Sequence, residues 1–201
     1  MMVRVALAED QGMVRDALAR LLQLEPGFSV IGTTEDGAGA LALADLGPDV
    51  ILLDIEMPVM DGLEACRAIR AAHPDVRVVM LTTFGRPGYL REAMEAGAAG
   101  FLLKDDPVPV LAAKLRRIVA GETVVDPALA VGALRAGPSP LSAREREVLR
   151  AALDGRPVSE IARSLHLGEG TVRNHLSTII QKLGVQNRAQ ALRRAEENGW
   201  L

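Results

Sequence analysis

The sequence has almost no cysteine, because Cys66 is the only one among 201 residues. A single thiol cannot form a disulfide within the chain, and no cluster of cysteine and histidine offers the ligand spacing of a zinc site. Apolar runs are also short, and none approaches the roughly 18 residues that a membrane-spanning helix needs. Glu9 and Asp10 interrupt the first apolar segment before a signal peptide would be complete. We therefore expect a soluble, cytoplasmic protein that is not inserted in a membrane.

Composition and charge predict a globular chain with two dissimilar parts. Hydrophobic residues make up 49% and charged residues 24%, and the 19 glycines and 11 prolines are too scattered for a low-complexity chain. Residues 1–137 carry 13 basic and 19 acidic side chains, whereas residues 138–201 carry 10 and 7. The mildly basic second part is compatible with a polyanionic partner and equally with an ordinary solvated surface. The charge alone does not decide between these two interpretations.

Short apolar runs alternate with amphipathic stretches through the first 120 residues. The apolar runs predict strands over residues 3–8, 28–31, 50–53, 77–81 and 100–103. The third and fourth are nearly continuous in valine, isoleucine, leucine and methionine, as expected of parallel strands buried on both faces. Repeated β–α units of this kind predict an α/β fold, a doubly wound parallel sheet of five strands with helices on both faces. We assign this domain to residues 1–121.

The pattern changes after Gly121. Residues 122–140, rich in proline and glycine at both ends, are predicted to be a linker with room for a short helix. From residue 141 onward the pattern is helical throughout, and it begins with the capping box Ser142-Ala143-Arg144-Glu145. Four helices are expected, at about residues 143–154, 158–165, 169–183 and 187–198. The second and third are separated by a turn of about four residues, which predicts a small all-α helix-turn-helix domain over residues 141–201.

Side chains suited to a cation and a phosphoryl group follow four of the predicted strands. Glu9 and Asp10 follow the first, Asp54 closes the third, Thr82 closes the fourth and Lys104 follows the fifth. The carboxyl ends of parallel strands open onto one crevice, so these side chains should meet. Three carboxylates together repel one another unless a hard cation neutralises them, and Mg²⁺ prefers such oxygen ligands.

Asp54 is the candidate nucleophile of this group. A carboxylate can attack phosphorus to give an aspartyl phosphate, and Lys104 with Mg²⁺ would neutralise the charge on the transferring oxygens. The turn after Asp54 also offers the backbone carbonyl of Glu56 to the metal. Each residue alone has a structural explanation, as a turn, a helix cap or a surface charge. Their joint placement at successive strand ends favours a functional site over separate structural roles.

The third helix of the second domain is expected to enter the major groove of DNA with its N-terminal end first. Arg173 has the bidentate geometry for guanine, Asn174 can pair with adenine, and Ser177 lies on the same face. Thr171 and His175 are candidate phosphate contacts, although a packed or solvent-facing histidine is an equal alternative.

Lys182, further along the same helix, is either a contact to the DNA backbone or part of the plain surface. Between these polar positions, apolar residues repeat at helical spacing and are assigned to the core. These are Val172, Leu176, Ile179 and Leu183.

Residues 1–121 resemble the receiver domain of two-component response regulators. The matching segments are Glu9-Asp10, Asp54-x-x-Met57-Pro58, Met60-Asp61-Gly62, Leu81-Thr82-Thr83 and Gly97-Ala98-x-Gly100-Phe101-Leu102-Leu103-Lys104. The resemblance implies that Asp54 accepts phosphate from a histidine kinase and that Glu9 and Asp10 hold Mg²⁺. It also implies that Thr82 and Lys104 contact the phosphoryl group.

The same resemblance makes Phe101 the switch aromatic, at a position where tyrosine is common. Glu9 likewise stands where aspartate is commoner, and its longer side chain can alter the metal affinity.

Residues 141–201 resemble the LuxR-type helix-turn-helix of the NarL/FixJ family. The match runs through Leu141-Ser142-x-Arg144-Glu145-x-Glu147-Val148-Leu149, Glu160-Ile161-Ala162, Thr171-Val172-Arg173-Asn174-His175-Leu176 and Lys182-Leu183-Gly184-Val185. Pro157 and Gly168 depart from the family, because both stand where a capping serine is common. Two short segments, residues 86–89 and 170–174, are most similar to regulators of membrane-lipid desaturation within this family.

These observations predict a response regulator that is not an enzyme. It would take phosphate on Asp54, form a homodimer and bind double-stranded promoter DNA. A phosphohydrolase of the haloacid dehalogenase type is disfavoured, because that class carries its nucleophilic aspartate near the first strand with a second acid two residues on. The other alternative is a phosphorylation-switched module that binds protein without specific DNA binding, which Arg173 and Asn174 disfavour.

Overall fold

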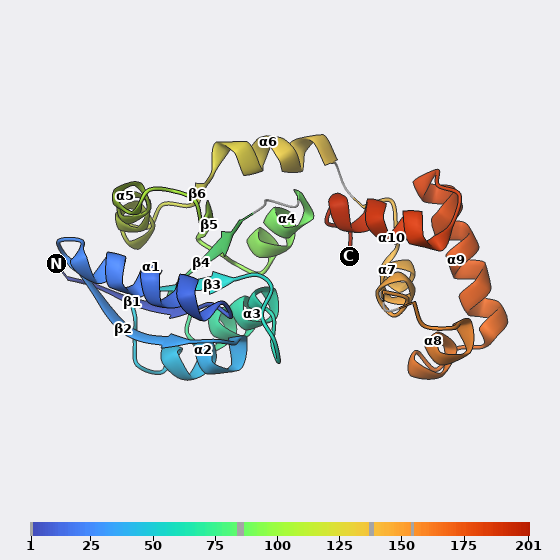
Figure 1. Cartoon of the computed structure of the whole chain (residues 1–201), viewed down its shortest axis with the longest axis horizontal. Coiled ribbons are helices and arrows are strands. Elements are labelled where there is room, and N and C mark those ends of the chain that lie inside the picture. Colours follow the sequence, from blue (N-terminus) through green and yellow to red (C-terminus); the bar gives the residue numbers. More distant parts are fainter. Residues whose placement is uncertain (1, 84–86, 137–138, 154) are drawn as a thin grey trace. The chain divides into compact units, whose positions relative to one another are not determined.

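The computed structural model describes residues 2–83, 87–136, 139–153 and 155–201 (Figure 1). The chain divides into two compact units. The first comprises residues 1–85 and 89–131, and the second comprises residues 132–201 with residues 86–88. In the part of the chain that the structure describes, every helix is too short or too polar to cross a bilayer.

A six-stranded parallel sheet forms the centre of the first unit, with the strand order β2-β1-β3-β4-β5-β6. The strands are β1 (Val3–Ala8), β2 (Phe28–Thr34), β3 (Val50–Asp54), β4 (Arg77–Thr82), β5 (Gly100–Leu103) and β6 (Val124–Val125). The five predicted strands and their parallel, doubly wound arrangement are confirmed. The sixth strand was not predicted, because a two-residue strand leaves too short an apolar run to recognise.

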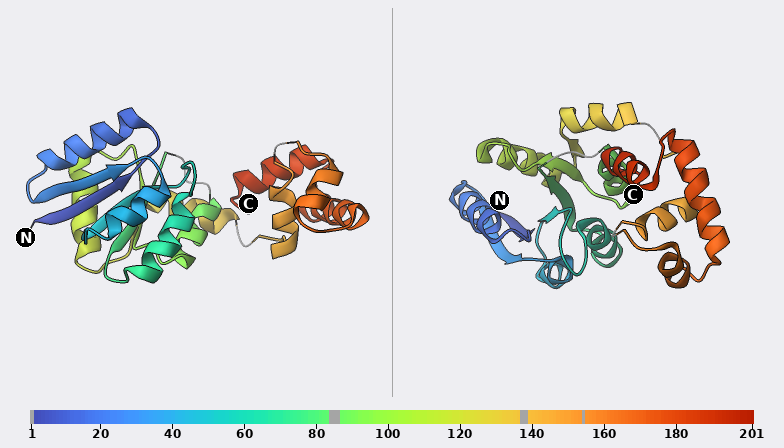
Figure 2. Two further views of the ribbon diagram at one scale, coloured as in Figure 1. Left: turned by 90° about the horizontal axis from the view of Figure 1, so that it is seen from below. Right: turned by 45° about the vertical axis from the view of Figure 1, so that its right-hand side comes forward.

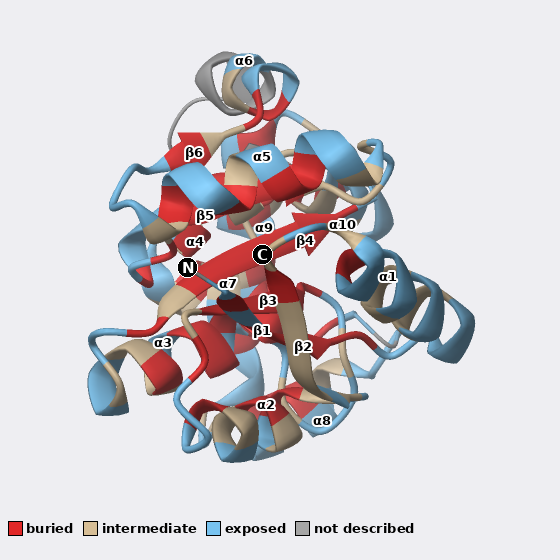
Figure 3. Ribbon diagram, turned by 90° about the vertical axis from the view of Figure 1, so that its left-hand side faces the viewer, coloured by how far each residue is buried: buried red, intermediate tan, exposed pale blue. Residues whose placement is uncertain are grey.

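Helices cover both faces of this sheet (Figure 3). They are α1 (Gly12–Leu24), α2 (Gly37–Ala44), α3 (Gly62–Ala72), α4 (Pro87–Glu95) and α5 (Val108–Val119). A further helix, α6 (Pro127–Ala136), follows β6, and only its first residues belong to this unit. Buried side chains of α1 and α5 form one core with alternate residues of the strands, such as Leu7, Leu52 and Leu81. Side chains alternate along a strand, so the intervening residues, such as Leu53 and Met80, are buried on the opposite face.

The segment predicted as a linker begins with regular structure. Val124 and Val125 pair in parallel with Gly100 and Phe101 of β5, and α6 starts two residues later at Pro127. The structure thus places the start of residues 122–140 within the first unit, because the backbone of this segment extends the sheet.

The second unit is helical, as predicted, and Figure 2 shows its helices from two further sides. They are α7 (Ala143–Arg150), α8 (Val158–Ser164), α9 (Glu169–Leu183) and α10 (Arg188–Glu197). Val148, Leu149, Ile161, Val172 and Ile179 are fully buried in a common core with α10. The packing of α8 and α9 on one another is the helix-turn-helix arrangement.

Side-chain caps set the limits of several of these helices. Ser142 and Glu145 form the predicted capping box, in which Ser142 N donates to Glu145 Oε2 at 2.6 Å and Glu145 N donates to Ser142 Oγ at 3.3 Å. α7 ends at Arg150, earlier than the expected end near residue 154, and Asp154 lies outside the described residues. Pro157 precedes α8 and Gly168 precedes α9, and neither forms a side-chain cap, because neither side chain has a hydrogen-bond acceptor.

Candidate functional site

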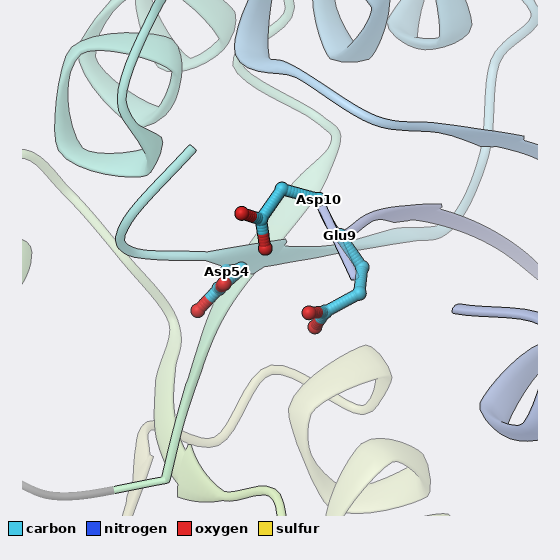
Figure 4. A group of neighbouring side chains, drawn as sticks. All are labelled: Glu9, Asp10 and Asp54. Carbon is cyan, nitrogen blue, oxygen red and sulfur yellow. The ribbon is translucent and has the colours of Figure 1, made fainter. Parts of the chain in front are cut away.

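The predicted acidic residues meet where β1 and β3 end (Figure 4). Asp54 is the last residue of β3, and Glu9 follows β1 directly, held there by a bond from its backbone N to the Thr34 carbonyl at 3.0 Å. One carboxylate oxygen from each of Glu9, Asp10 and Asp54 lies within 4.8 Å of the others. Glu9 and Asp54 are buried, whereas Asp10 is exposed to solvent. The sheet topology therefore brings together the acids that the sequence predicted.

Lys104 completes this group from the end of β5. Its Nζ lies 2.7 Å from Glu9 Oε2 and 2.9 Å from Asp54 Oδ1, and its side chain is only 7% exposed. Lys104 N also donates to the Thr82 carbonyl at 2.9 Å, which fixes the end of β5 beside the end of β4. The ammonium thus bridges two buried carboxylates that come from different strands.

Burial and repulsion make these carboxylates harder to ionise than usual. Burial is the main cause that raises the pKa of Glu9, and the nearby Asp54 charge adds to it, while Lys104 acts in the opposite direction. The pKa of Asp54 is raised as well, mainly by burial, against hydrogen bonds from Lys104 and from the Ile55 backbone N at 2.8 Å. One ammonium does not fully compensate the cluster, so the site favours a further cation.

The oxygen donors of this site fit a hard divalent cation. Asp10 is open to solvent beside two buried carboxylates, and Mg²⁺ typically binds through one or two carboxylates while keeping several waters. Glu56 follows in the turn after β3, and its side chain accepts a hydrogen bond from Tyr89 Oη at 3.3 Å. Its backbone carbonyl belongs to the same turn, which allows the role predicted for it.

A glycine lets this turn pass close to the site. A Cβ atom at Gly62 would lie 1.9 Å from the Asp54 carbonyl oxygen, so any larger residue at this first position of α3 would push the helix away. Asp61, just before it, caps α3 by accepting from Glu64 N at 2.7 Å. The Asp61-Gly62 pair that the sequence singled out therefore positions Asp54 through its backbone.

Two further predicted residues lie at the ends of neighbouring strands. Thr82 is buried at the end of β4, next to the strand that carries Lys104. Phe101 is fully buried in β5 and pairs with Met80. The structure therefore places Phe101 in the core in this conformation.

Sequence reasoning missed one basic residue at this site. Arg15 Nη1, from α1, donates to the Glu9 carbonyl at 2.7 Å. Arg15 lies five residues after Asp10, in the first turn of α1, and this position next to the acidic pair could have pointed to it. Its guanidinium stabilises the turn that presents Glu9 and Asp10.

The predicted DNA-contacting residues lie along α9 in the second unit. Thr171, Arg173, Asn174 and Ser177 are exposed, and His175 is half-buried. Arg173 Nη2 forms an ion pair with Glu169 Oε2 at 2.7 Å, one helical turn earlier. Thr171, Arg173 and Asn174 lie in the N-terminal half of α9, the part that a recognition helix offers to DNA bases, and Ser177 follows Arg173 by four residues.

Lys182, near the end of α9, has a partner within its own unit. Its Nζ lies 2.8 Å from Glu145 Oε2, which joins α9 to the start of α7. Burial opposes ionisation of Glu145, but hydrogen bonds from Lys182 and Ser142 outweigh it and lower the pKa of this carboxyl. Lys182 thus has a structural contact in addition to any contact with DNA.

Two family models match the chain, one for each unit. Residues 5–116 match the response regulator receiver domain, and residues 139–195 match the bacterial regulatory proteins of the luxR family. Both matches agree with the domain types that the sequence motifs predicted.

Relatives match this chain over its whole length. YvfU of Bacillus subtilis (strain 168), an uncharacterized transcriptional regulatory protein, is 45% identical over all of both chains. The transcriptional regulatory protein DesR of the same organism is 41% identical over all of both chains. The solved RcsB–DNA complex is 25% identical, with a TM-score of 0.67 over 98% of this chain and 99% of that one. Similarity over the whole length, in both domains and in their order, shows that the chain belongs to the response regulator transcription factors that join a receiver domain to a LuxR-type DNA-binding domain.

Proposed function

We propose that Asp54 accepts a phosphoryl group from a sensor histidine kinase and that this modification controls DNA binding by the second unit. The observation that carries the first part is the contact of Lys104 Nζ with both Asp54 Oδ1 and Glu9 Oε2, at 2.9 and 2.7 Å. This contact supports the proposal because the cation lies beside the Asp54 carboxylate, where the charge of a transferring phosphoryl group would develop.

Each residue of the site has a distinct role in this proposal. An oxygen of Asp54 attacks phosphorus, and the bond from phosphorus to the donor's leaving atom breaks. Lys104 and the Thr82 hydroxyl bind the phosphoryl oxygens. Glu9, Asp10, Asp54 and the Glu56 carbonyl would hold Mg²⁺, which supplies positive charge to the phosphoryl oxygens when bound.

Phosphorylation of Asp54 would change the surroundings of Phe101 and Thr82. The phosphoryl group adds about −1.5 to −2 charge and three acceptor oxygens. Movement of Thr82 toward these oxygens would change the packing around Phe101, which is already fully buried in the unmodified chain. A packed core tends to have discrete arrangements, so this shift can select a different outer surface.

The second unit would then bind promoter DNA as part of a homodimer. Arg173, Asn174 and Ser177 would contact base edges, and Thr171, His175 and Lys182 would contact phosphates. One small helix-turn-helix binds weakly, whereas joining two raises the effective concentration of the second contact to about the millimolar range. The DNA site should be an inverted repeat with half-sites about one helical turn apart.

Incubation with Mg²⁺ and acetyl phosphate tests the phosphoacceptor. The wild-type chain should gain one phosphate, detected by mass spectrometry, and Asp54→Ala should gain none. Asp75→Ala, an exposed aspartate just before β4 at the opposite edge of the sheet, is the matched control and should be phosphorylated normally. Phosphorylation of Asp54→Ala at the wild-type level would assign the acceptor elsewhere.

Sedimentation and DNA retardation test the rest of the proposal. The phosphorylated chain should be a dimer at micromolar concentration and should bind its promoter DNA more tightly than the unmodified chain. A monomer that nevertheless binds tightly after phosphorylation would instead indicate release of an inhibited helix-turn-helix. Failure of both forms to bind DNA would favour a protein-interaction module.

A further inference from the structure

A cluster of three charged side chains joins separate elements of the first unit, away from the Asp54 site. Lys114 Nζ, on α5, lies 2.7 Å from Asp106 Oδ2 and 3.0 Å from Asp126 Oδ2. The three side chains are only 12–17% exposed. Asp106 precedes α5 and Asp126 precedes α6, so the ammonium bridges two segments that are distant in sequence.

The Asp106 side of this cluster leads to the phosphorylation site. Asp106 follows Lys104 by two residues, in the turn that connects β5 to α5. Lys104 itself contacts Asp54 and Glu9. A displacement of Lys104 toward a phosphoryl group would therefore pull on the turn that Lys114 holds through Asp106.

The Asp126 side leads to the segment that connects the two units. Asp126 N donates to the Phe101 carbonyl at 3.0 Å, and Asp126 Oδ1 accepts from Ala128 N at 2.9 Å in the first turn of α6. One residue thus contacts the strand that carries Phe101, the beginning of α6 and Lys114. A displacement of β5, or a change in the contact with Lys114, would therefore move Asp126 and with it the start of α6.

The same helix offers an exposed ion pair for comparison. Arg117 Nη2 lies 2.7 Å from Glu122 Oε2, but these side chains are 58% and 53% exposed. Exposed pairs of this kind contribute little, because solvent screens them. Burial disfavours the charge on Lys114, yet the two carboxylates outweigh it and raise the pKa of this ammonium. Removing Lys114 would leave two partly buried carboxylates without their common counterion.

We propose that Lys114 is a positioning residue that couples the turn after Lys104 to the start of α6, and so transmits the phosphorylation state of Asp54 toward the DNA-binding unit. This inference rests on the proposed function of Asp54. It assigns part of the regulation to a three-residue ion-pair cluster and not to the aromatic switch alone. The coupling is a difference in free energy between two states, and it can be measured directly.

The experiment compares the DNA affinity of unmodified and phosphorylated full-length chains. In the wild type, phosphorylation should raise the affinity by about 5- to 150-fold, the range of a typical allosteric coupling. Lys114→Met keeps the length of the side chain but removes its charge, and it should reduce that gain by about 2- to 30-fold. Phosphate incorporation from acetyl phosphate should stay at the wild-type level, because Lys114 does not contact Asp54 in the structure.

Three further variants keep the result interpretable. Arg117→Met removes the exposed pair of the same helix and should leave the gain unchanged. Lys114→Arg keeps the bridging charge and should restore most of the gain. Asp126→Asn keeps an oxygen to cap α6 but removes the charge facing Lys114. It should therefore reduce the increase in DNA affinity on phosphorylation as Lys114→Met does, and it replaces Lys114→Met in the test if that variant does not fold.

The outcomes separate this inference from the proposed function. A wild-type gain that persists in full in Lys114→Met or in Asp126→Asn overturns the role of Lys114 and leaves the proposed function intact. A loss in Arg117→Met equal to that in Lys114→Met also overturns it, because the effect would then be general to α5. The absence of any gain in the phosphorylated wild type overturns the proposed switch itself.

Discussion

The two units use charge in opposite ways. In the receiver unit, Glu9, Asp54 and Lys104 form a cluster whose side chains are 0%, 10% and 7% exposed. On α9 of the DNA-binding unit, Arg173 and Glu169 form a pair whose side chains are 64% and 49% exposed. The first site holds its charges in a fixed arrangement out of water, whereas the second presents them to solvent.

This difference predicts which properties a substitution will affect. A buried charge that loses its partner destabilises the fold, because the remaining charge has no water to solvate it. An exposed charge is solvated with or without its partner, so removing it should change the affinity for DNA more than the stability of the fold. The receiver site should therefore couple function to stability, and the DNA-binding surface should separate them.

The largest effect is expected for Lys104→Met. Without the ammonium, two buried carboxylates face each other, and the free energy of unfolding should fall by about 3–5 kcal/mol. Urea unfolding followed by circular dichroism, at neutral pH and without Mg²⁺, measures this change. Added Mg²⁺ should recover more stability in the variant than in the wild type, because a cation replaces the missing charge. A loss under about 1 kcal/mol would contradict the buried-charge interpretation.

Arg173→Ala tests the opposite case on the exposed surface. DNA binding should weaken by about 1–3 kcal/mol at one base pair, with relaxed preference there, while the stability of the free protein changes by less than about 0.5 kcal/mol. Competition binding with single-base variants of the DNA site measures the first, and urea unfolding measures the second. A uniform loss over all sequences would make Arg173 a phosphate contact.

The capping carboxylate of the DNA-binding unit gives a pH prediction. The pKa of Glu145 is lowered in the folded protein, since Lys182 and Ser142 outweigh the effect of burial. Its contribution, about 1 kcal/mol, should be present above the ordinary glutamate pKa and be lost as the pH falls through the lowered value.

Trp200 allows this measurement in one unit alone. It is the single tryptophan, and it packs against the core of the helical unit. Its fluorescence during urea unfolding should show the acid-induced loss in the wild type. In Glu145→Gln, which can still cap α7, this part of the pH dependence should disappear, and an unchanged profile would argue against the Glu145–Lys182 contribution.

The smallest effect concerns backbone strain. Val59, in the turn after β3, has φ +67°, and His166, before α9, has φ +53°. A β-branched side chain is strained in this region, whereas histidine occurs there several-fold more often. Val59→Gly should therefore raise the stability of the receiver unit by about 0.5–1 kcal/mol, and His166→Gly should give a smaller gain or none. Thermal unfolding measures both changes in stability, and equal gains in Val59→Gly and His166→Gly would contradict the expected difference between valine and histidine.

Much of the receiver site could be predicted because it depends on one topological rule. Asp54, Thr82 and Lys104 stand at the ends of recognisable apolar strands, and parallel strands present those ends to one crevice. The capping box of α7 could be predicted for a related reason, because Ser142 and Glu145 interact within one helical turn.

The remaining contacts join segments that no local pattern connects. Lys182 and Glu145 are 37 positions apart in the chain, and Lys114 and Asp126 are 12 apart. Lys114, Asp126 and Lys182 each have the sequence signature of an ordinary surface charge, and the capping box explains Glu145 without reference to Lys182. Their pairing depends on which helices pack together and in which orientation.

The sequence by itself determined the order of strands and helices, the division into two kinds of domain and the identity of the charged residues at the strand ends. These follow from periodicity and spacing, which act within a few residues. Only the tertiary structure decided that β6 and the start of α6 belong to the receiver unit, that Arg15 supports the Glu9 turn and that Lys114 links Asp106 to Asp126. The physical reason is that burial and ion pairing depend on distances in space, which packing sets after the local elements have formed.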